Sequence, residues 1–433
     1  MQLTKRQQKL RALESSRNSA KKSNPTSYVN QAPFRYAERN FKSRSPPPDM
    51  TEVFDFANMD GNADVIKKRI VEVKLKSDLR GLCSLFGDSE ETWRDQWDRA
   101  YVIKGVPGLV VIPNPFSPPA QRHLVRRCLR VHARHPNLSN LDTHYNMPLQ
   151  GLWELVEREW RGNLKESDKD YFVSLKNIDT GGENGDSVYD EEEKDYPRQP
   201  DISSSPSLND SQHATTPTLK LDPLPSPTVP VLSPRQLIRK LRWITLGYQY
   251  HWATKTYHLN RRVAFPEDVG DIATAVVKAV EGVGLDEEGW RNDYAGDDFR
   301  PQAGVINYYQ LRDALMGHVD QSELNMQAPL VSVSLGHDCI YLMGGPTRDT
   351  KPVALRLRSG DIVVMTGESR TCFHGVPRIL ENTLPGHLAP EYWTHAETSE
   401  QVPDDDWRIF GEYISEARIN LNVRQVFDRE VGM

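Results

Sequence analysis

The C-terminal half of the chain alternates hydrophobic and polar residues in short runs, and Gly, Pro or Asp closes most of them. The runs are GVINYY, LVSVSLG, CIYLMGG, VALRLRSGDIVVMTG and INLNVRQV, which all begin after residue 303. Turn residues spaced about every eight to twelve positions are typical of an all-β sandwich or barrel. The pattern predicts a β-rich core, which begins near residue 235 with the aromatic-rich stretch RQLIRKLRWITLGYQYHW.

Helical patterns flank these runs. In PEDVGDIATAVVKAVEGVG (266–284), apolar residues recur at three- and four-residue steps, and two glycines offer a C-terminal stop. Further upstream, GLVVIPNPF (108–116) predicts a strand that enters a loop. Ser117 and Pro118 then predict a helix start, and that helix should run to about His135, where a proline follows.

Composition divides the chain into four segments. Residues 1–50 are polar and basic, which predicts a disordered tail. Residues 51–160 mix helical and strand patterns and are expected to pack on the core as an extension. Residues 161–234 are first acidic and then rich in Ser, Pro and Thr, which predicts a disordered insertion. Residues 235–433 hold the main folded domain, so the expected class is α+β, with helices around a β sandwich.

The overall composition excludes several classes of protein. The 433 residues carry a net charge of −6, and no apolar run reaches the roughly 18 residues that a membrane helix needs. The four cysteines lie far apart without a CxxC pair, so we expect neither a disulfide framework nor a structural zinc site of the usual spacing. We expect a monomer with no membrane partner in the nucleus, the cytoplasm or both. The basic N-terminus leaves the mitochondrion as an alternative.

The helix predicted after Ser117 carries a row of arginines spaced by four residues. They are Arg122, Arg126, Arg130 and Arg134. Like charges at this spacing repel by roughly a few tenths of a kcal/mol per pair. A nucleic-acid phosphate backbone would offset the repulsion, and so would exposure to solvent or neutralisation by the protein's own acids. The row therefore has two competing interpretations: it contacts a nucleic-acid backbone, or it is an ordinary charged face of the helix.

An isolated His-x-Asp, His318 and Asp320, lies among the predicted strands. With 12 histidines in the chain, one such pair can occur by chance on a surface turn. Residues at i and i+2 of a strand point the same way, however, and a sandwich can return His374 to meet them. Two His and one carboxylate form the facial triad of non-haem Fe(II) oxygenases. Zinc is the competing metal, but the H-E-x-x-H motif of hydrolytic zinc sites is absent.

A second constellation lies near the C-terminus in ARINLNVRQV. Arg418, Asn420 and Arg424 fall at even spacing, on one face of a predicted strand. Two inward-facing arginines are costly to bury without an anion, and their bidentate forks suit a dicarboxylate. Asn307 and Tyr309, also two residues apart, can add hydrogen bonds from an opposing strand. The alternative is an exposed edge strand.

These motifs resemble those of the AlkB family of Fe(II)/2-oxoglutarate dioxygenases. The matching stretches, in the family's order, are LRWITLGYQY, INYY, HVDQSE, APLVSVSLG, SGDIVVMTGESR, FHGVPR and RINLNVRQV. HVDQSE, HGVPR and GLVVIPNPF are similar to the eukaryotic branch of AlkB homologue one. The resemblance covers roughly residues 100–160 and 235–428 and leaves the tail and the insertion outside.

The resemblance implies a double-stranded β-helix (jelly roll) core with Fe(II), 2-oxoglutarate and O2 as cofactors. The implied metal ligands are His318, Asp320 and His374, and the implied 2-oxoglutarate residues are Asn307, Tyr309, Arg418, Asn420 and Arg424. The implied reaction is oxidative removal of an N-methyl group from a base of RNA (tRNA or mRNA) or DNA, with release of formaldehyde, succinate and CO2. N-methyladenine, methylated at N6 or N1, is the expected base.

A methylated base must leave its stack to reach the metal, so an aromatic platform is expected. Tyr248 lies where the family places a stacking aromatic, and Tyr257 is nearby. Bacterial members carry a second acid two residues after the metal-binding Asp, as a contact to the base. Ser322 stands there in this chain, and Glu323 follows it as a substitute. This departure puts the bacterial substrates in doubt.

Three other functions remain open on the sequence. The chain could oxidise another methylated tRNA base, or hydroxylate or demethylate a protein such as a histone. It could also be an inert nucleic-acid-binding protein. The intact His-x-Asp, distal His and arginine pair argue against an inert site.

Overall fold

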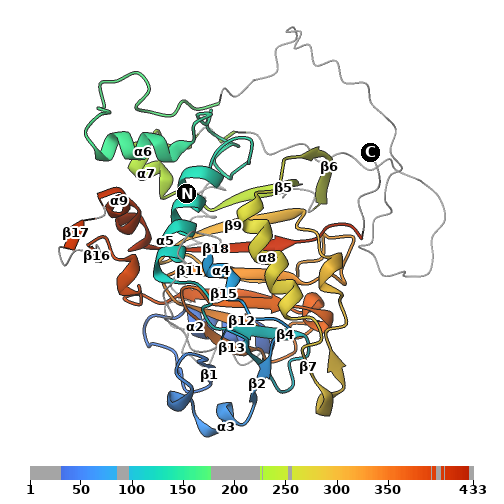
Figure 1. Ribbon diagram of the computed structural model, residues 1–433. Helices are drawn as coiled ribbons and strands as arrows, with labels where there is room; N and C mark the ends of the chain where they lie inside the picture. The colour runs from blue at the N-terminus through green and yellow to red at the C-terminus, as the bar shows by residue number, and fades with distance from the viewer. Residues whose placement is uncertain are drawn as a thin grey trace, which may run out of the picture.

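A computed structural model describes the chain in several ranges separated by short and long gaps. The ranges are residues 31–84, 97–176, 225–226, 228–251, 256–391, 393–395, 401–403 and 405–428. Two large, mostly antiparallel sheets with helices around them make up these residues, which confirms the predicted α+β class (Figure 1). Within the described ranges, no helix has the length and apolar character of a membrane span.

Helices surround the two sheets. They are α2 (Pro33–Lys42), α3 (Asp64–Lys67), α4 (Gly81–Ser84), α5 (Pro118–Arg126), α6 (Leu152–Trp160), α7 (Pro234–Ile238), α8 (Glu267–Ala279) and α9 (Asp405–Ile414). A π-helical turn over Arg127–His132 continues α5. The predicted start of α5 is confirmed, because the Ser117 side chain accepts a hydrogen bond from the backbone N–H of Ala120 at 3.2 Å.

The larger sheet has nine strands. Their order is β2 (Ile70–Lys74), β3 (Arg99–Ile103), β4 (Leu109–Ile112), β14 (Ile362–Met365), β11 (Leu330–Gly336), β18 (Ala417–Arg424), β9 (Ala303–Gln310), β5 (Trp243–His251) and β6 (Thr256–Arg262). The predicted extension thus supplies three edge-side strands to the same sheet as the core.

The smaller sheet has five strands. Their order is β1 (Val53–Phe54), β13 (Val353–Leu357), β12 (Cys339–Met343), β15 (His374–Ile379) and β10 (Leu315–His318). Two short hairpins, β7 (Gly284–Leu285) with β8 (Trp290–Arg291) and β16 (Trp393–His395) with β17 (Gln401–Pro403), lie apart from both sheets.

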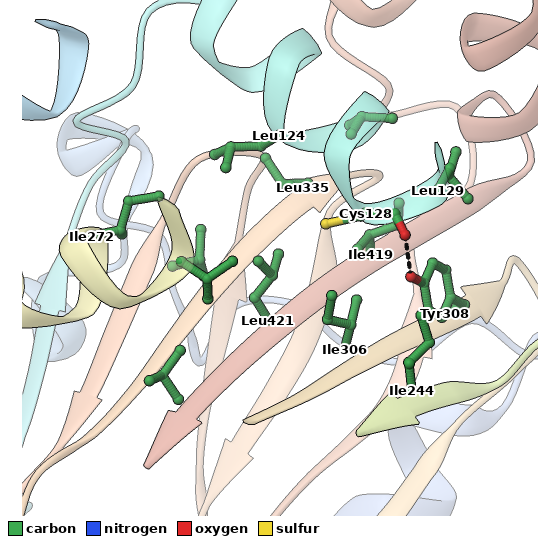
Figure 2. Close-up of a cluster of buried hydrophobic side chains, with 14 of the residues drawn as sticks. Leu124, Cys128, Leu129, Ile244, Ile272, Ile306, Tyr308, Leu335, Ile419 and Leu421 are labelled. Atoms are coloured by element: carbon green, nitrogen blue, oxygen red, sulfur yellow. Dashed lines mark hydrogen bonds between the residues drawn. The ribbon is translucent and has the colours of Figure 1, made fainter. Parts of the chain in front are cut away.

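The outer face of the nine-stranded sheet is covered by α5, its π turn and α8 (Figure 2). Ile306 and Tyr308 of β9 and Ile419 of β18 face these helices in one buried cluster. The Tyr308 hydroxyl donates a hydrogen bond to the Cys128 carbonyl at 2.6 Å, where the π turn leaves that carbonyl available. Because side chains alternate along a strand, the neighbours of these apolar residues must face the other sheet.

The inner faces of the two sheets pack on each other through a second buried cluster. Tyr309 and Val363 reach it from the large sheet, and Tyr341 and Leu355 from the small one. At one end of this interface, apolar side chains give way to the polar residues of β9, β18 and β10. The candidate site therefore lies inside the sandwich.

The N-terminal tail predicted over residues 1–50 is shorter than expected. Helix α2 lies within it and buries Phe34 and Phe41 against Ile340 and Leu342 on the outer face of the small sheet. Apolar residues at helical spacing in PFRYAERNFK carry this packing. The remainder of the predicted tail, up to residue 30, lies outside the described residues.

The insertion predicted over 161–234 also begins later than expected. Leu164, Tyr171 and Val173 are buried against the same cluster that α6 joins. At the other end, α7 begins at a capping box formed by Ser233 and Gln236. Residues 177–224, which hold most of the acidic and Ser/Pro-rich sequence, lie outside the described residues.

Candidate metal and anion site

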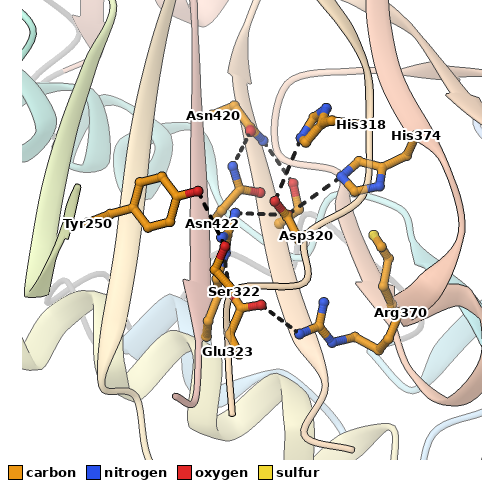
Figure 3. Close-up of polar contacts among 12 residues, drawn as sticks. Tyr250, His318, Asp320, Ser322, Glu323, Arg370, His374, Asn420 and Asn422 are labelled. Atoms are coloured by element: carbon orange, nitrogen blue, oxygen red, sulfur yellow. Dashed lines mark hydrogen bonds and ion pairs between the residues drawn. The ribbon is translucent and has the colours of Figure 1, made fainter. Parts of the chain in front are cut away.

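His318, Asp320 and His374 come together at the edge of the small sheet. His318 ends β10 and lies directly opposite His374, which begins β15. One ligand atom from each of the three residues lies within 4.8 Å of the other two. Asp320 reaches between the rings, with its oxygens 3.7 Å from Nε2 of His318 and 3.6 Å from Nε2 of His374 (Figure 3).

Both imidazole rings are oriented by backbone carbonyls. Nδ1 of His318 lies 2.9 Å from the carbonyl oxygen of Met316, and Nδ1 of His374 lies 3.2 Å from that of Cys372. A carbonyl oxygen can only accept a hydrogen bond, so each Nδ1 carries the proton. The Nε2 lone pairs are therefore the ones that face Asp320 and can bind a metal.

Electrostatics favour the ligand form of each group. Burial and the neighbouring His374 lower the pKa of His318, which favours the neutral ring. Burial alone would favour a protonated Asp320, but the Arg424 guanidinium and His374 outweigh it and hold the pKa of Asp320 well below its usual range. Metal binding requires a neutral imidazole and an ionised carboxylate. The three side chains thus fit a divalent cation of the kind that the facial triad holds.

The predicted face of β18 points into the sandwich beside this triad. Arg418, Asn420 and Arg424 are all buried, and Asn422 between them donates to the Asn420 side-chain oxygen at 2.9 Å. Tyr309 lies opposite Arg418, and Asn307 lies opposite Asn420, across the β9–β18 pair. The structure therefore brings all five predicted 2-oxoglutarate residues to one inner surface.

Arg418 is a buried cation without a carboxylate partner among the described residues. Its side chain donates to the Ser334 hydroxyl at 2.8 Å, whereas its Nε is buried and has no hydrogen-bond partner. An unpaired buried guanidinium costs several kcal/mol, on the order of the penalty for any buried ion. A small carboxylate ligand would complete its hydrogen bonds, so the site fits an anion. Ser334 was not among the anion-binding residues predicted from the sequence, although its place in LVSVSLG marks it as an inward polar residue.

Arg424 differs from Arg418 because two acids already surround it. Its Nη2 lies 2.8 Å from Asp320 and its Nη1 lies 2.9 Å from Glu323. Glu323 is fully buried and also lies 3.4 Å from Nη2 of Arg370, which carries an orphaned Nη1. Two acids and two arginines thus form a balanced cluster that includes Asp320 of the triad, as Figure 3 shows in part. Arg370 was missed from sequence, because nothing in GESR distinguishes a buried arginine from an exposed one.

The cluster includes Glu323 and involves Tyr257, both of which were predicted to contact substrate. The Tyr257 hydroxyl donates to Glu323 at 3.0 Å, and burial raises the pKa of Tyr257, so the phenol stays a donor. With its side chain fully covered by Tyr257, Arg424 and Arg370, Glu323 has no surface left for a base. Both residues contact Arg424 in the structure, and their contact with a substrate stays a prediction.

The other two predicted substrate residues are Ser322 and Tyr248, and both are partly buried. Ser322 is half-buried, and its hydroxyl lies 3.3 Å from that of Tyr250 (Figure 3). Tyr248 packs edge-on against Phe427, with ring centroids 5.3 Å apart, and Arg262 lies over its ring. Tyr250, two residues after Tyr248 on β5, was missed from sequence although the alternation in LGYQYHW places both on one face.

The arginine row on α5 and its π turn is occupied by the protein itself. Arg122 is almost fully buried, and Arg130 forms ion pairs with Glu157 and with Asp406, the latter at 2.8 Å. Arg126 also faces Asp406, at 3.4 Å, which leaves Arg134 as the exposed member. Neutralisation by the protein's own acids is thus the alternative that the structure favours. A nucleic-acid backbone contact along the row stays a prediction, which the next experiment tests.

We expect charge reversal of both Arg126 and Arg130 to leave the salt dependence of nucleic-acid binding unchanged. A phosphate contact would reduce the slope of log K against log salt by about one per residue lost. The double variant should instead lower the melting temperature, because Asp406 and Glu157 would face like charges. Reversal of the exposed Arg134 is the matched comparison. A smaller salt slope in the double variant would show that the row does contact phosphates.

The chain is similar to a known protein family and to several known proteins. A model of the 2OG-Fe(II) oxygenase superfamily matches residues 208–424. "Nucleic acid dioxygenase ALKBH1" of Homo sapiens is 32% identical over 76% of this chain and 66% of its own length, just under two thirds.

Two further relatives have more specific names. "tRNA demethylase abh1" of Schizosaccharomyces pombe is 30% identical over 91% of this chain and 95% of its own length. "DNA N(6)-methyladenine demethylase ALKBH1A" of Arabidopsis thaliana is 38% identical over 44% of this chain and 50% of its own length. All three names refer to a nucleic acid, and two of them state the removal of a methyl group.

Proposed function

Because the chain belongs to the 2OG-Fe(II) oxygenase superfamily, and within it to the AlkB-homologue-one group, we propose that it removes N-methyl groups from bases of nucleic acid by oxidation. The proposed products are the demethylated base, formaldehyde, succinate and CO2. The observation that carries the proposal is Arg418, a buried arginine without an acid partner among the described residues, inside the same sandwich as a His–Asp–His cluster.

The sandwich supports the finer assignment of a double-stranded β-helix. From β9 to β15, most successive core strands alternate between the two sheets: β9 and β11 belong to the large sheet, and β10 and β12 to the small one. β14 then returns to the large sheet and β15 to the small sheet, before β18 closes the large one. β10 and β15 pair at the edge of the small sheet, and Asp320, just after β10, contacts Arg424 of β18 in the large sheet.

His318, Asp320 and His374 would hold Fe(II), and Arg418 would bind a carboxylate of 2-oxoglutarate. Asn307, Tyr309, Asn420 and Arg424 line the same inner surface and would complete its binding. When bound, Fe(II) and 2-oxoglutarate supply the activation of O2 and the transfer of one oxygen atom to the methyl carbon. The resulting N-hydroxymethyl group releases formaldehyde without further help from the protein.

The chain's own residues have three tasks in this proposal. The Nδ1–H donors of both histidines fix the rings with Nε2 toward the ligand position. Arg424 keeps Asp320 ionised and in place. The two sheets exclude water from the inner surface, which strengthens each charge interaction there.

A methylated base is the proposed substrate, in tRNA, mRNA or DNA. Tyr248 and Tyr250 present aromatic rings on one face of β5, near Ser322, and could stack a base that has left its helix. The names of the relatives favour adenine methylated at N6 in DNA, or a methylated base of tRNA.

Succinate formation tests the proposal. We expect the protein with Fe(II) and 2-oxoglutarate to form succinate and formaldehyde in equal amounts on N6-methyladenine oligonucleotides, and far less on unmethylated ones. His374→Ala is the matched inactive protein. Turnover on methylated histone peptides but on no oligonucleotide would overturn the substrate class, and turnover on neither would favour an inert binding protein.

A further inference from the structure

Helix α2 lies behind the strands that carry both histidines, on the side away from the ligand position. The ring of Phe34 fills the space over Gly317 and Gly344. An added Cβ would lie 2.3 Å from a Phe34 ring carbon at Gly317 and 2.6 Å from one at Gly344. Gly317 directly precedes His318. Only a glycine lets the helix approach so closely, so the contact is built into both segments.

Glu38 of α2 points into this contact as a buried acid. The residue is 1% exposed, and its Oε1 accepts a hydrogen bond from the backbone N–H of Gly317. Its Oε2 pairs with Arg35 at 2.9 Å, on the solvent side of the helix. A buried carboxylate needs such partners to offset its desolvation. The hydrogen bond to Gly317 is the one of these two contacts that lies next to His318.

The peptide that Glu38 holds is also the one that orients His318. The N–H of Gly317 and the C=O of Met316 belong to one planar unit, and they point in opposite directions. Nδ1–H of His318 donates to that C=O at 2.9 Å. The hydrogen bonds therefore run in series from the Glu38 carboxylate, through the Met316–Gly317 peptide, to the imidazole. A chain of this kind polarises each member and strengthens the next bond.

We propose that Glu38 is a positioning residue that holds His318 as a metal ligand through the Met316–Gly317 peptide. The inference rests on the metal-binding role of His318 proposed above. Carboxylates that bond directly to a ligand histidine fix its orientation and raise its basicity. Here one peptide unit stands between the carboxylate and the ring, and it transmits the orienting effect.

His374 provides an internal comparison. Its Nδ1 donates to the Cys372 carbonyl, and the N–H of the same peptide, on Phe373, donates to the Gly345 carbonyl at 2.9 Å. The series of bonds is the same, but it ends in a neutral carbonyl. The side-chain acceptor is thus a specific addition at the half-exposed His318, whereas the ring of His374 is buried.

A second contact ties the same backbone from its other side. Nη2 of Arg348 donates to the Gly317 carbonyl at 2.8 Å, and its guanidinium lies 4.5 Å over the ring of Phe373. The backbone N–H of Phe34 in turn donates to the Arg348 carbonyl at 3.0 Å. Helix α2 and Arg348 together fix both polar groups of Gly317, which leaves His318 little freedom to leave its position.

Cobalt(II) binding to the full-length chain tests the proposal without any turnover. Co(II) substitutes for Fe(II), and its visible absorption reports both affinity and coordination. We expect Glu38→Met, which fills the space without an acceptor, to raise the Co(II) dissociation constant about ten-fold, the lower end for loss of a ligand's hydrogen-bond partner. Glu38→Gln keeps an acceptor for Gly317 and should remain within about two-fold of the wild type. Arg35→Ala, which removes only the solvent-side partner, should also remain so.

The outcomes are distinct. Glu38→Met that folds and binds Co(II) within two-fold of the wild type overturns the proposal, as does Glu38→Gln that binds as weakly as Glu38→Met. If Glu38→Met does not fold, hydrogen exchange in the wild type decides: a protected Gly317 amide supports the bond, and an amide that exchanges as in an open loop overturns it. His318→Ala is the reference that should not bind Co(II). If the wild-type chain also bound no Co(II), the metal site itself would be refuted.

Discussion

Arg418→Met is expected to abolish 2-oxoglutarate binding while leaving the protein as stable as the wild type or more so. Each charge-assisted hydrogen bond from the guanidinium to a carboxylate contributes about 1.5–3 kcal/mol, so the loss of two weakens binding at least about 100-fold. The free energy of unfolding should not fall, because the substitution removes a buried cation that has no acid partner among the described residues. Replacing buried charges by apolar groups of similar size is often neutral or stabilising by about 1–4 kcal/mol.

The measurement combines 2-oxoglutarate titration with thermal unfolding of the same samples. Arg370→Met is the matched control, because Arg370 is equally buried but pairs with Glu323. Its loss should lower stability by about 1–3 kcal/mol through a partly unsatisfied Glu323. If Arg418→Met lowered the melting temperature as much as Arg370→Met does, Arg418 would be a structural residue and not an anion site.

Asp320→Ala should reduce succinate formation at least about 100-fold. Loss of a residue that merely supports a metal ligand already costs about 10–100-fold in affinity or activity, and Asp320 lies between both histidines. The change also leaves Arg424 with Glu323 as its one remaining acid. We therefore expect a loss of Co(II) binding together with a lower melting temperature.

Asp55→Ala controls for the general effect of removing a paired acid. Asp55 forms an ion pair with Arg358 at a distance from the site. Its loss should affect stability but not the turnover of the folded protein. Retained succinate formation in Asp320→Ala, at a normal protein fold, would exclude Asp320 from the metal site.

The sequence allowed the inner face of β18 to be predicted because strand geometry is local. Alternation alone placed Arg418, Asn420 and Arg424 on one side of a strand, and that side proved to be the inner one. His318 and Asp320 were informative only with the family's motif order. Their distance from His374 depends on how β10 pairs with β15, and the residue pattern of a single strand cannot predict its partner.

The predictions that the structure does not favour concern partners that lie far apart in the chain. Glu323 was expected to contact a base because bacterial members of the family carry a second acid next to this position. Its partners Tyr257, Arg424 and Arg370 come from three other segments and bury it. The arginines after Ser117 were ambiguous for the same reason, because Asp406, which neutralises two of them, is remote in sequence.

Helix α2 was not predicted, because the composition of residues 1–50 indicated a disordered tail. The basic character of residues 1–50 outweighed a clear helical spacing of Phe34, Ala37 and Phe41. Averaged composition describes long segments well, but a ten-residue helix needs only one apolar stripe to pack. A scan for short amphipathic stripes would have found it.

The contact between α2 and Gly317 has a consequence for the order in which the protein folds. Glu38 and Gly317 are separated by 279 positions, so the helix leaves the ribosome long before the strand that it must hold. Contacts of such separation form late, after the loop between them has been closed by other interactions. The two sheets can pair first, and the N-terminus then docks on their outer face. The support behind His318 would accordingly be completed at the end of folding, when α2 docks on the strand that carries this histidine.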